Sequence, residues 1–324
     1  MASRDGDRAN AFAARAGASY SFDSYARLLE LPELDIVYVA TPNHRHKDDC
    51  LQAIAAGKAV LCEKPLALSA AEARTVAEAG QKAGLFCMEG MWTHFIPSVV
   101  EAEKLLNKGA IGRAVFLSGS FGVPTFFSKE NRFFSLTLGG GALLDRGCYP
   151  ISLALRFLGS VESVSGACVL AETGVDATAA GLIRFASGAL AVIETSLVAY
   201  QSNNLVISGT KGRLVLHESI TQPRMLSLAV REPVDPTLKP SGGKTLVRRI
   251  LDKHGVLAWL TFLVRNRPRY IAYKGNGYVH EIEEAHCCLR SGVTESSTVP
   301  LKLSIATLEV IDAIKQSAVQ AAGD

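Results

Sequence analysis

The sequence contains no run of apolar residues long enough to cross a membrane. The longest candidate, residues 255–264, has ten residues, whereas a bilayer core needs about 20. Basic residues flank this run, so an interfacial or partner-docking segment is one alternative, but we favour an insertion that packs on its own sheet. Residues 1–8 lack the apolar core of a secretory signal. We therefore predict no membrane span and no signal peptide.

Metal-type cysteine pairs and an excess of one charge are also lacking. None of the seven cysteines stands in a CxxC pair, and an odd number of cysteines in apolar surroundings is typical of reduced thiols in a cytoplasmic protein. Lysine and arginine number 34 against 31 aspartates and glutamates, so the formal charge of +3 gives no reason to expect nucleic-acid binding. The sequence also holds no nucleophile elbow and no P-loop.

Two histidine-containing clusters have the wrong spacing for a metal site. His44 and His46 are two residues apart, so they point to different faces of a helix. His280 and His286 fall with two cysteines on a terminal helix whose period separates the two histidines. We therefore predict no metal.

The sequence does contain enough apolar residues for two domains, which we place at 1–95 and 96–324. Hydrophobic residues make up 48% of the 324 positions, which indicates a packed globular protein. In the first domain, helices are expected over 5–16, 22–30, 44–56 and 69–84, and strands over 35–40, 58–62 and 85–89. Ser69 and Glu72 form a capping box at the start of the last helix. Strands that alternate with helices imply βαβ units and a parallel sheet, hence an α/β domain.

The second domain is rich in β-branched residues at hairpin spacing. After a helix over 142–158, strands are expected over 161–172, 177–185, 189–199, 203–208 and 213–218. The segment 209–212 between the last two is a turn signal. A long excursion over 232–276 precedes two helices over 277–290 and 302–320. These patterns predict a largely antiparallel sheet in an α+β domain.

A lysine held between a glutamate and a proline follows the second strand. Proline fixes its own φ and restricts the residue before it to extended conformations, so Lys64 leaves the strand on a stiff backbone between Glu63 and Pro65. Open α/β folds bind ligands at the carboxyl ends of their strands. A ligand-binding ammonium group and an ordinary loop lysine both fit this tripeptide alone.

The two neighbouring strands also end in polar or aromatic residues. Thr41, Pro42 and Asn43 follow strand 35–40, and Glu89 to Trp92 follow strand 85–89. Loops at strand ends are commonly polar. Three consecutive strands that bring such groups to one edge, together with a fixed lysine, nevertheless favour a ligand site.

A further cluster begins with three glycines at 139–141. Asp145 and Tyr149 follow, and their spacing of four places both side chains on one helix face. Glycines allow the backbone to approach a ligand or another element closely. A carboxylate, a phenol and a lysine in one pocket form a proton-transfer set, because an ammonium group stabilises a phenolate. Alone, the cluster would be interpreted as an amphipathic helix with a buried tyrosine.

Together these motifs resemble the Gfo/Idh/MocA oxidoreductase family, and within it the branch of dimeric dihydrodiol and D-xylose:NADP dehydrogenases. The resemblance covers most of the chain and is weakest over 232–272. The segments that carry it are 40–43 with His46, 57–58, 63–65, 88–93, 140–149 and 208–212. It implies a Rossmann domain, a second domain with a large open sheet, and hydride transfer between NAD(P) and an alcohol or hemiacetal carbon of a sugar or trans-dihydrodiol.

The resemblance also implies roles for individual residues. Lys64, Tyr149 and Asp145 would be catalytic, and Trp92 and Tyr149 would contact the substrate. Ser3 and Arg4 would favour the 2′-phosphate of NADP, with NAD as the alternative cofactor. The family further implies a homodimer formed through the open sheet. The complete set of expected cofactor contacts is Ser3, Arg4, Thr41, Pro42, Asn43, His46, Glu63 and Lys64.

The sequence departs from the family pattern at two places. His94 stands where many relatives carry arginine, which leaves open a role there in binding a substrate anion or in an interface. The sequence also lacks the strand followed by G-x-G-x-x-G that opens a Rossmann domain, and Gly275 and Gly277 are no substitute. We therefore expect an N-terminally truncated sheet, missing roughly 30 residues of the first βαβ unit through a misplaced start or a truncated gene model.

Two functions remain open at this point. The missing glycine loop favours a non-catalytic scaffold or interaction protein. The joint presence of Lys64, Asp145 and Tyr149 favours an NADP-dependent dehydrogenase. The aromatic residues do not decide whether the substrate is a sugar or a dihydrodiol; they are Trp92, Phe95, Phe121, Phe126 and Phe127.

Overall fold

The chain divides into two units, and the computed structural model describes residues 1–231 and 267–323. Unit 1 comprises Met1–Met91 and Glu283–Ile305. Unit 2 comprises Trp92–Ile282 and Ala306–Asp324, apart from the residues that are not described. The apolar run at 255–264 and most of the expected excursion at 232–276 therefore lie outside the described residues.

Unit 1 is built on a parallel sheet in the order β1-β2-β3. Its strands are β1 (Ile36–Val39), β2 (Ala59–Glu63) and β3 (Cys87–Gly90). Each is short and mostly apolar, and a helix returns the chain between successive strands, as parallel pairing requires. The predicted parallel sheet is confirmed.

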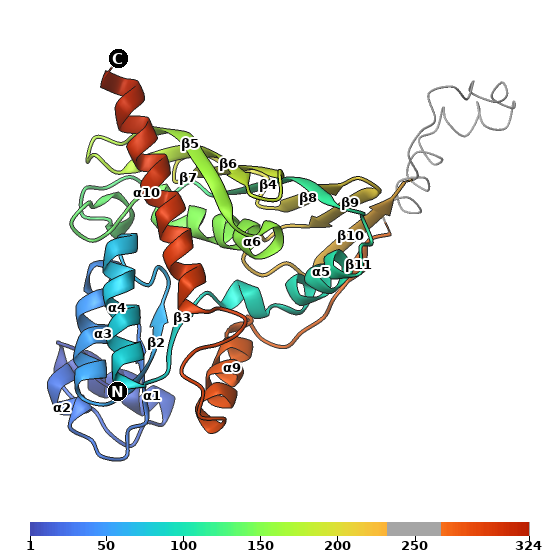
Figure 1. The fold of residues 1–324 in the computed structure, drawn as a ribbon. Helices are drawn as coiled ribbons and strands as arrows, with labels where there is room; N and C mark the ends of the chain where they lie inside the picture. Colours follow the sequence, from blue (N-terminus) through green and yellow to red (C-terminus); the bar gives the residue numbers. More distant parts are fainter. Residues whose placement is uncertain (232–266, 324) are drawn as a thin grey trace, which may run out of the picture. The chain divides into compact units, whose positions relative to one another are not determined.

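The helices in residues 1–91 of unit 1 are α1 (Gly6–Ala16), α2 (Tyr25–Leu29), η1 (Asn43–Arg45), α3 (His46–Ala55) and α4 (Ala70–Ala83). Ser69 Oγ accepts the Glu72 N–H, as the capping box predicts, and Gly84 ends α4 with a left-handed φ of 63°. Figure 1 shows α3 and α4 side by side against the sheet.

Unit 2 contains an eight-stranded sheet in the order β11-β10-β9-β8-β4-β7-β6-β5. Among its described strands, only the β4–β7 pair is parallel, so the predicted antiparallel character is confirmed. The bounds are β4 (Ala114–Gly122), β5 (Val161–Leu170), β6 (Asp176–Phe185), β7 (Leu190–Ser196), β8 (Leu205–Gly209), β9 (Gly212–Leu216), β10 (Met225–Val230) and β11 (Arg269–Tyr270).

Several elements of unit 2 were not expected from the sequence. They include helix α5 (Pro97–Asn107), strand β4, which lies between β7 and β8, and strands β10 and β11 at one edge of the sheet. Strand β4 carries Ser118, Gly119 and Ser120 where β-branched residues are usual. Gly119 is small because a Cβ there would lie 2.8 Å from Cβ of Pro150. Because packing requires small residues in β4, its sequence lacks the β-branched pattern that would have predicted a strand.

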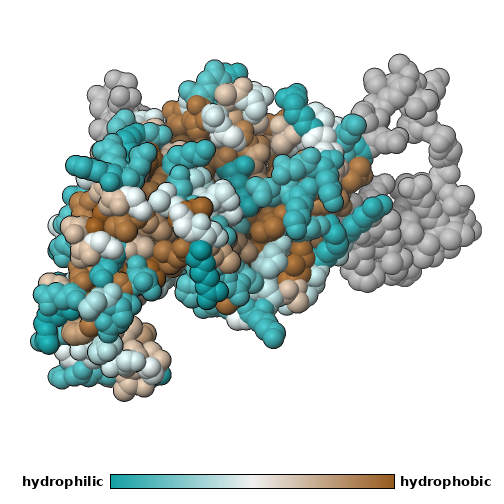
Figure 2. Space-filling model, turned by 60° about the horizontal axis from the view of Figure 1, so that its bottom comes forward, coloured by the Kyte–Doolittle hydropathy of each residue, from teal (hydrophilic) through white to brown (hydrophobic). Residues whose placement is uncertain are grey.

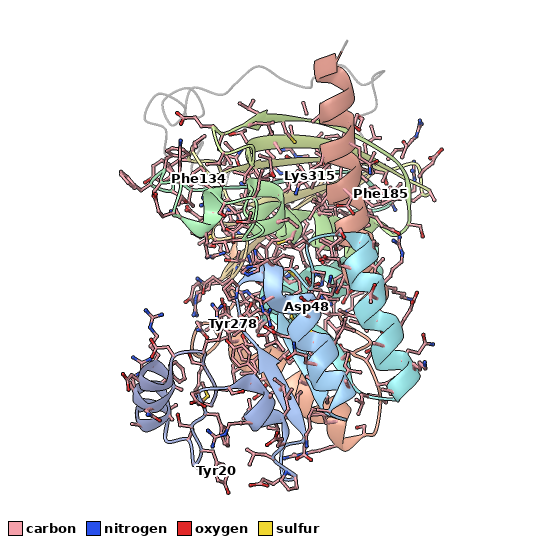
Figure 3. The ribbon with its side chains drawn as sticks, turned by 90° about the vertical axis from the view of Figure 1, so that its left-hand side faces the viewer. Tyr20, Asp48, Phe134, Phe185, Tyr278 and Lys315 are labelled. Atoms are coloured by element: carbon pink, nitrogen blue, oxygen red, sulfur yellow. The ribbon has the colours of Figure 1, made fainter. Side chains whose placement is uncertain are left out.

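Helices α6 (Cys148–Leu158) and α10 (Leu301–Gly323) cover the same face of this sheet. Gly119, Ile193, Gly181 and Gly166 are register partners across four strands, so they share a face. Pro150 of α6 lies against Gly119, and Ile314 of α10 lies against Gly166 and Gly181. Lys315 projects from α10 toward the sheet (Figure 3).

The opposite face of the sheet is open. Phe116, Leu182 and Val169 are 37%, 45% and 67% exposed, and the sheet register places them on the face that α6 and α10 leave uncovered. On the side of the molecule shown in Figure 2, hydrophilic side chains in teal are interspersed with hydrophobic ones in brown. Over residues 1–231 and 267–323, no helix is both long and apolar enough to span a bilayer.

Candidate active site

Lys64 lies at the carboxyl edge of the unit 1 sheet, directly after β2. Its side chain is half-buried, and its backbone N–H donates to Oε2 of Glu63 at 3.2 Å. The Tyr38 hydroxyl donates to the other oxygen of Glu63. The Glu63 carboxylate therefore connects the neighbouring strand β1 to the loop that contains Lys64.

A buried carboxylate lies beneath this loop. Glu89 of β3 is 3% exposed, and its Oε1 accepts the Leu66 N–H at 2.9 Å. Burial raises the pKa of Glu89, although the Leu66 N–H and the nearby Lys64 ammonium both favour the charged form. Lys64 therefore has a buried acidic neighbour in Glu89. The sequence places Glu89 in a strand-end motif but does not indicate that it lies near Lys64.

His46 ties two of the edge loops together. The ring is fully buried, with Nδ1 2.7 Å from the Pro65 carbonyl oxygen and Nε2 2.7 Å from the Thr41 carbonyl oxygen. The Thr41 hydroxyl donates to Asp49 at 2.7 Å, and Arg45 forms an ion pair with the same carboxylate at 2.6 Å. Both ring nitrogens of His46 thus contact backbone carbonyl oxygens, so the ring connects the loop after β1 to the loop after β2. A direct cofactor contact from His46 stays a prediction.

The other expected cofactor contacts of unit 1 lie at strand ends. Pro42 precedes η1, and Asn43 begins it with a largely buried side chain. Ser3 follows a parallel bridge between Ala2 and Phe22, and its hydroxyl accepts the Asp5 N–H at 3.2 Å. Arg4, next in the chain, is exposed.

In unit 2, Gly141 allows another element to approach the start of a helix closely. A π-helical turn, η4 (Leu143–Gly147), continues into α6. Asp176 of β6 sits where a side chain at Gly141 would lie, and its Oδ2 accepts the Leu143 N–H at 2.6 Å. Burial raises the pKa of Asp176, while Lys315, 3.8 Å away, and backbone N–H groups oppose the shift. Asp176 therefore holds the start of the helix that carries Asp145 and Tyr149.

Asp145 lies within the π-helical turn and is paired with two arginines. Its carboxylate oxygens lie 3.7 Å from Arg132 Nη2 and 3.7 Å from Arg146 Nε. Arg146 is itself buried and donates to the carbonyl oxygens of Val123 and Ser196. These contacts anchor the turn to the ends of β4 and β7.

Tyr149 belongs to a row of aromatic side chains. The Trp92 indole N–H donates to the Tyr149 hydroxyl at 3.2 Å, and both side chains are buried. Tyr278 stacks on Trp92 with ring centroids 4.7 Å apart and an interplanar angle of 11°. Phe121 meets the edge of Tyr149 at 5.8 Å. Tyr278 and Phe121 are the half-buried members of this row, and sequence reasoning gave Tyr278 no role.

One sequence signal could have identified Tyr278. It begins α9 (Tyr278–Arg290) and follows Gly277, whose φ is 102°. A Cβ at Gly277 would overlap Ile96 and lie 3.1 Å from the Trp92 ring. A glycine directly before an aromatic residue marks this close approach.

All the predicted cofactor contacts, including Glu63 and Lys64, belong to unit 1. The other predicted site residues, Asp145, Tyr149 and Trp92, belong to unit 2. His94, the departure from the family pattern, is fully buried and bonded to Ser152 and Arg156. Among the described residues, no group of three or more histidine, cysteine, aspartate or glutamate side chains is arranged to hold a metal ion.

Comparison with known proteins places both units in one family. The family model described as "Oxidoreductase family, NAD-binding Rossmann fold" matches residues 1–91, and "GFO/IDH/MocA C-terminal domain" matches residues 99–215. Trans-1,2-dihydrobenzene-1,2-diol dehydrogenase of Xenopus tropicalis is 30% identical, with 100% of this chain and 89% of the relative covered. The protein of the same name from Oryctolagus cuniculus is 31% identical, with 98% and 89% covered.

Solved structures share the fold. Aldose-aldose oxidoreductase from Caulobacter crescentus, complexed with glycerol, matches with a TM-score of 0.81 and 24% identity over 99% of this chain and 89% of that one. Levoglucosan dehydrogenase in complex with NADH and levoglucosan matches with a TM-score of 0.82 and 22% identity over 98% and 87%. With two family models and relatives aligned over the whole chain, the protein belongs to the GFO/IDH/MocA family of oxidoreductases.

Proposed function

We propose that this protein is an NAD(P)-dependent dehydrogenase that acts on a secondary alcohol or hemiacetal carbon of a sugar or trans-dihydrodiol. The observation that carries the proposal is Lys64, held at the carboxyl edge of a parallel sheet beside the buried carboxylate of Glu89 in a chain of an oxidoreductase family. When bound, the nicotinamide supplies the hydride acceptor or donor.

The strand-end residues of unit 1 fit the nicotinamide half of such a cofactor. Thr41, Asn43 and Lys64 present polar groups at one sheet edge, and His46 keeps two of their loops together. Residues 1–324 contain no strand-associated G-x-G-x-x-G, so we assign no residue to the pyrophosphate.

Proton transfer is the proposed task of Lys64 and Tyr149. The Lys64 ammonium orients the substrate oxygen, and the Tyr149 hydroxyl gives or takes the proton at that oxygen. The Trp92 N–H, which donates to the Tyr149 oxygen, stabilises the hydroxyl when it loses its proton. Asp145, paired with Arg132 and Arg146, supports the start of the tyrosine-bearing helix.

The aromatic row favours a substrate with an apolar ring face. Tyr278 and Phe121 are half-buried, whereas Trp92 and Tyr149 are buried behind them. Such rings suit the CH-rich face of a sugar or the ring of a dihydrodiol. Relatives named for a dihydrodiol substrate support the second, and a neighbour complexed with levoglucosan supports the first.

We propose NADP as the preferred cofactor, through Arg4. This side chain is exposed after the bridge that joins Ala2 to Phe22, and a guanidinium there suits a 2′-phosphate. The test is the ratio of kcat/KM for NADP to that for NAD. Arg4→Ala should lower it about 10–100-fold, the value of one or two charge-assisted hydrogen bonds. Arg8→Ala, at an exposed arginine paired with Asp5, is the matched control.

The central experiment separates an enzyme from a scaffold. NADPH is titrated against the full chain by nicotinamide fluorescence, and turnover is measured with trans-1,2-dihydrobenzene-1,2-diol and with D-xylose. Lys64→Met and Tyr149→Phe should each lower kcat about 10²–10⁴-fold with cofactor affinity nearly unchanged.

The double variant distinguishes one site from two. If Lys64 and Tyr149 act on the same substrate oxygen, the double variant should lose far less than the product of the two single losses. Full turnover by Lys64→Met would refute the assignment. A folded chain that binds neither NADPH nor NADH would instead favour the scaffold function.

A further inference from the structure

A buried polar network joins two elements that carry the proposed site. One is η2 (Trp92–Phe95), a single helical turn, and the other is α6. His94 Nε2 lies 2.7 Å from Ser152 Oγ, and its Nδ1 lies 3.1 Å from Arg156 Nη1. Arg156 also donates to the His94 carbonyl oxygen at 2.7 Å. Two further bonds from Arg156, at 2.9 and 2.7 Å, reach Glu103 of α5.

The partners of His94 determine its tautomer. A guanidinium group can only donate hydrogen bonds, so the Nδ1 that faces Arg156 carries the lone pair. The ring proton is therefore on Nε2, which donates to the Ser152 hydroxyl. Burial and the positive charge of Arg156 both lower the pKa of His94, so the ring is a neutral, directional linker rather than a charge.

The network runs beside the bond between Trp92 and Tyr149. Trp92 and His94 belong to the same turn, and Tyr149, Ser152 and Arg156 are spaced three and four apart along α6, so they share a face. The indole bond to Tyr149 connects η2 to α6 at Trp92. The bonds of the His94 ring to Ser152 and Arg156, together with the bond from Arg156 to the His94 carbonyl oxygen, connect the same two elements at His94.

We propose that His94 is a positioning residue for Tyr149, which sets the distance between the Trp92 indole and the Tyr149 hydroxyl by holding η2 to α6. The expected change in kcat rests on the proposed function, whereas the expected change around Trp92 rests only on the hydrogen bonds between η2 and α6. A turn joined to α6 only at Trp92 could pivot about the indole bond, whereas the bonds at His94, two residues along, oppose that motion. Two of these bonds come from the imidazole, and the bond from Arg156 to the His94 carbonyl oxygen does not depend on the side chain. Misplacement of about 1 Å in a catalytic group can cost up to about 100-fold in rate.

The test uses the fluorescence of Trp92 in the full chain. Trp259 is the second of the two tryptophans, so a Trp259→Phe background reports Trp92 alone. Into it go His94→Ala, His94→Gln and Ser152→Ala. Glutamine can accept from Arg156 and donate to Ser152, and therefore rescues the link. His217→Ala is the matched control, because His217, directly after β9, makes the same kind of bond, 2.7 Å, to Ser227 of β10.

In His94→Ala we expect a changed Trp92 emission maximum and a several-fold higher acrylamide quenching constant, with the glutamine variant and the His217 control close to the parent. In the kinetic assay, kcat should fall about 10–100-fold with KM changed much less. Emission and quenching unchanged in a folded His94→Ala variant would overturn the proposal, whatever the enzyme assay shows. If that variant does not fold, Ser152→Ala is judged by the same criterion, because it removes only one hydroxyl.

Discussion

The carboxylate of Asp176 occupies the space that a side chain at Gly141 would fill. A Cβ at Gly141 would overlap the carboxylate of Asp176, with Cγ only 3.0 Å away. The same carboxylate accepts the Leu143 N–H at 2.6 Å. Because the first N–H groups of a helix have no partner within it, Asp176 satisfies a donor that would otherwise be buried unpaired. The glycine is thus required by a cap that comes from a distant strand.

The first prediction separates this overlap from backbone strain. Gly141 has a φ of 116°, and Gly159, at the other end of α6, has a φ of 89° with open space around it. Gly159→Ala should lower the free energy of unfolding by about 1–3 kcal/mol through strain alone. Gly141→Ala should cost clearly more, because it also displaces Asp176. Urea denaturation measures both, and equal losses would contradict the overlap.

The second prediction concerns Glu89 and predicts opposite effects on stability and activity. Burial raises its pKa above the unfolded value of about 4.3, so its charged form costs stability once the pH rises through the folded pKa. Glu89→Gln keeps an acceptor for the Leu66 N–H and should be at least as stable as the parent at pH 7. Activity should fall about tenfold, because Lys64 loses its acidic neighbour.

Stability is measured by urea denaturation and activity as kcat. Glu72→Gln is the matched control, since Glu72 accepts the Leu68 N–H at 3.1 Å in the following segment. It should leave kcat unchanged. A Glu89→Gln variant with parental kcat would show that Lys64 does not depend on this carboxylate.

The third prediction follows from the buried, neutral His94. Its pKa is lowered in the folded protein, whereas an unfolded histidine has a pKa of about 6.5. The unfolded chain therefore binds more protons below about pH 6.5, and the free energy of unfolding falls as the pH is lowered from there, by at most about 1.4 kcal/mol per pH unit for this group. His94→Gln should flatten this dependence between pH 6.5 and 5. The exposed position His286, changed to Gln, controls for loss of a histidine.

The fourth prediction concerns the open face of the unit 2 sheet, which we propose as a homodimer interface. Leu182 lies there in register with Val192 and Ser118, and it is 45% exposed. Exposed apolar sheet faces commonly mark interaction sites. Leu182→Glu should convert a dimer to a monomer in size-exclusion chromatography with light scattering. Ser187→Glu, in an exposed turn of the same sheet, should not. A monomeric parent at micromolar concentration would contradict the proposal.

Sequence reasoning succeeded where the signal is local. The capping box at Ser69 and Glu72 predicted the start of α4, and the alternation of short apolar runs with helices predicted the parallel sheet. It failed for β4, because Gly119 and its serine neighbours suit packing under Pro150 rather than strand propensity.

The candidate site shows the same limit. Lys64, Tyr149 and Asp145 stand in recognisable motifs, so they could be named from the sequence. Asp176 could not, because it contacts a helix start more than 30 positions earlier, and no spacing connects the two. The two backbone carbonyls that the His46 ring nitrogens face could not be named from the sequence either, and a cofactor contact from this ring stays a prediction. Long-range contacts of this kind leave no period in a sequence.

The π-helical turn at Leu143–Gly147 has a consequence for which mutations could move the site. Such a turn holds one residue more than an α-helical turn, and these turns occur often at functional sites. Deletion of one residue there would let the helix close into regular α-helical hydrogen bonding, with about 100° of rotation per residue, so residues within the turn would change their face relative to Tyr149. Asp145 would then point to another face without being substituted. At this turn, the direction in which Asp145 points depends on the number of residues as well as on their identity.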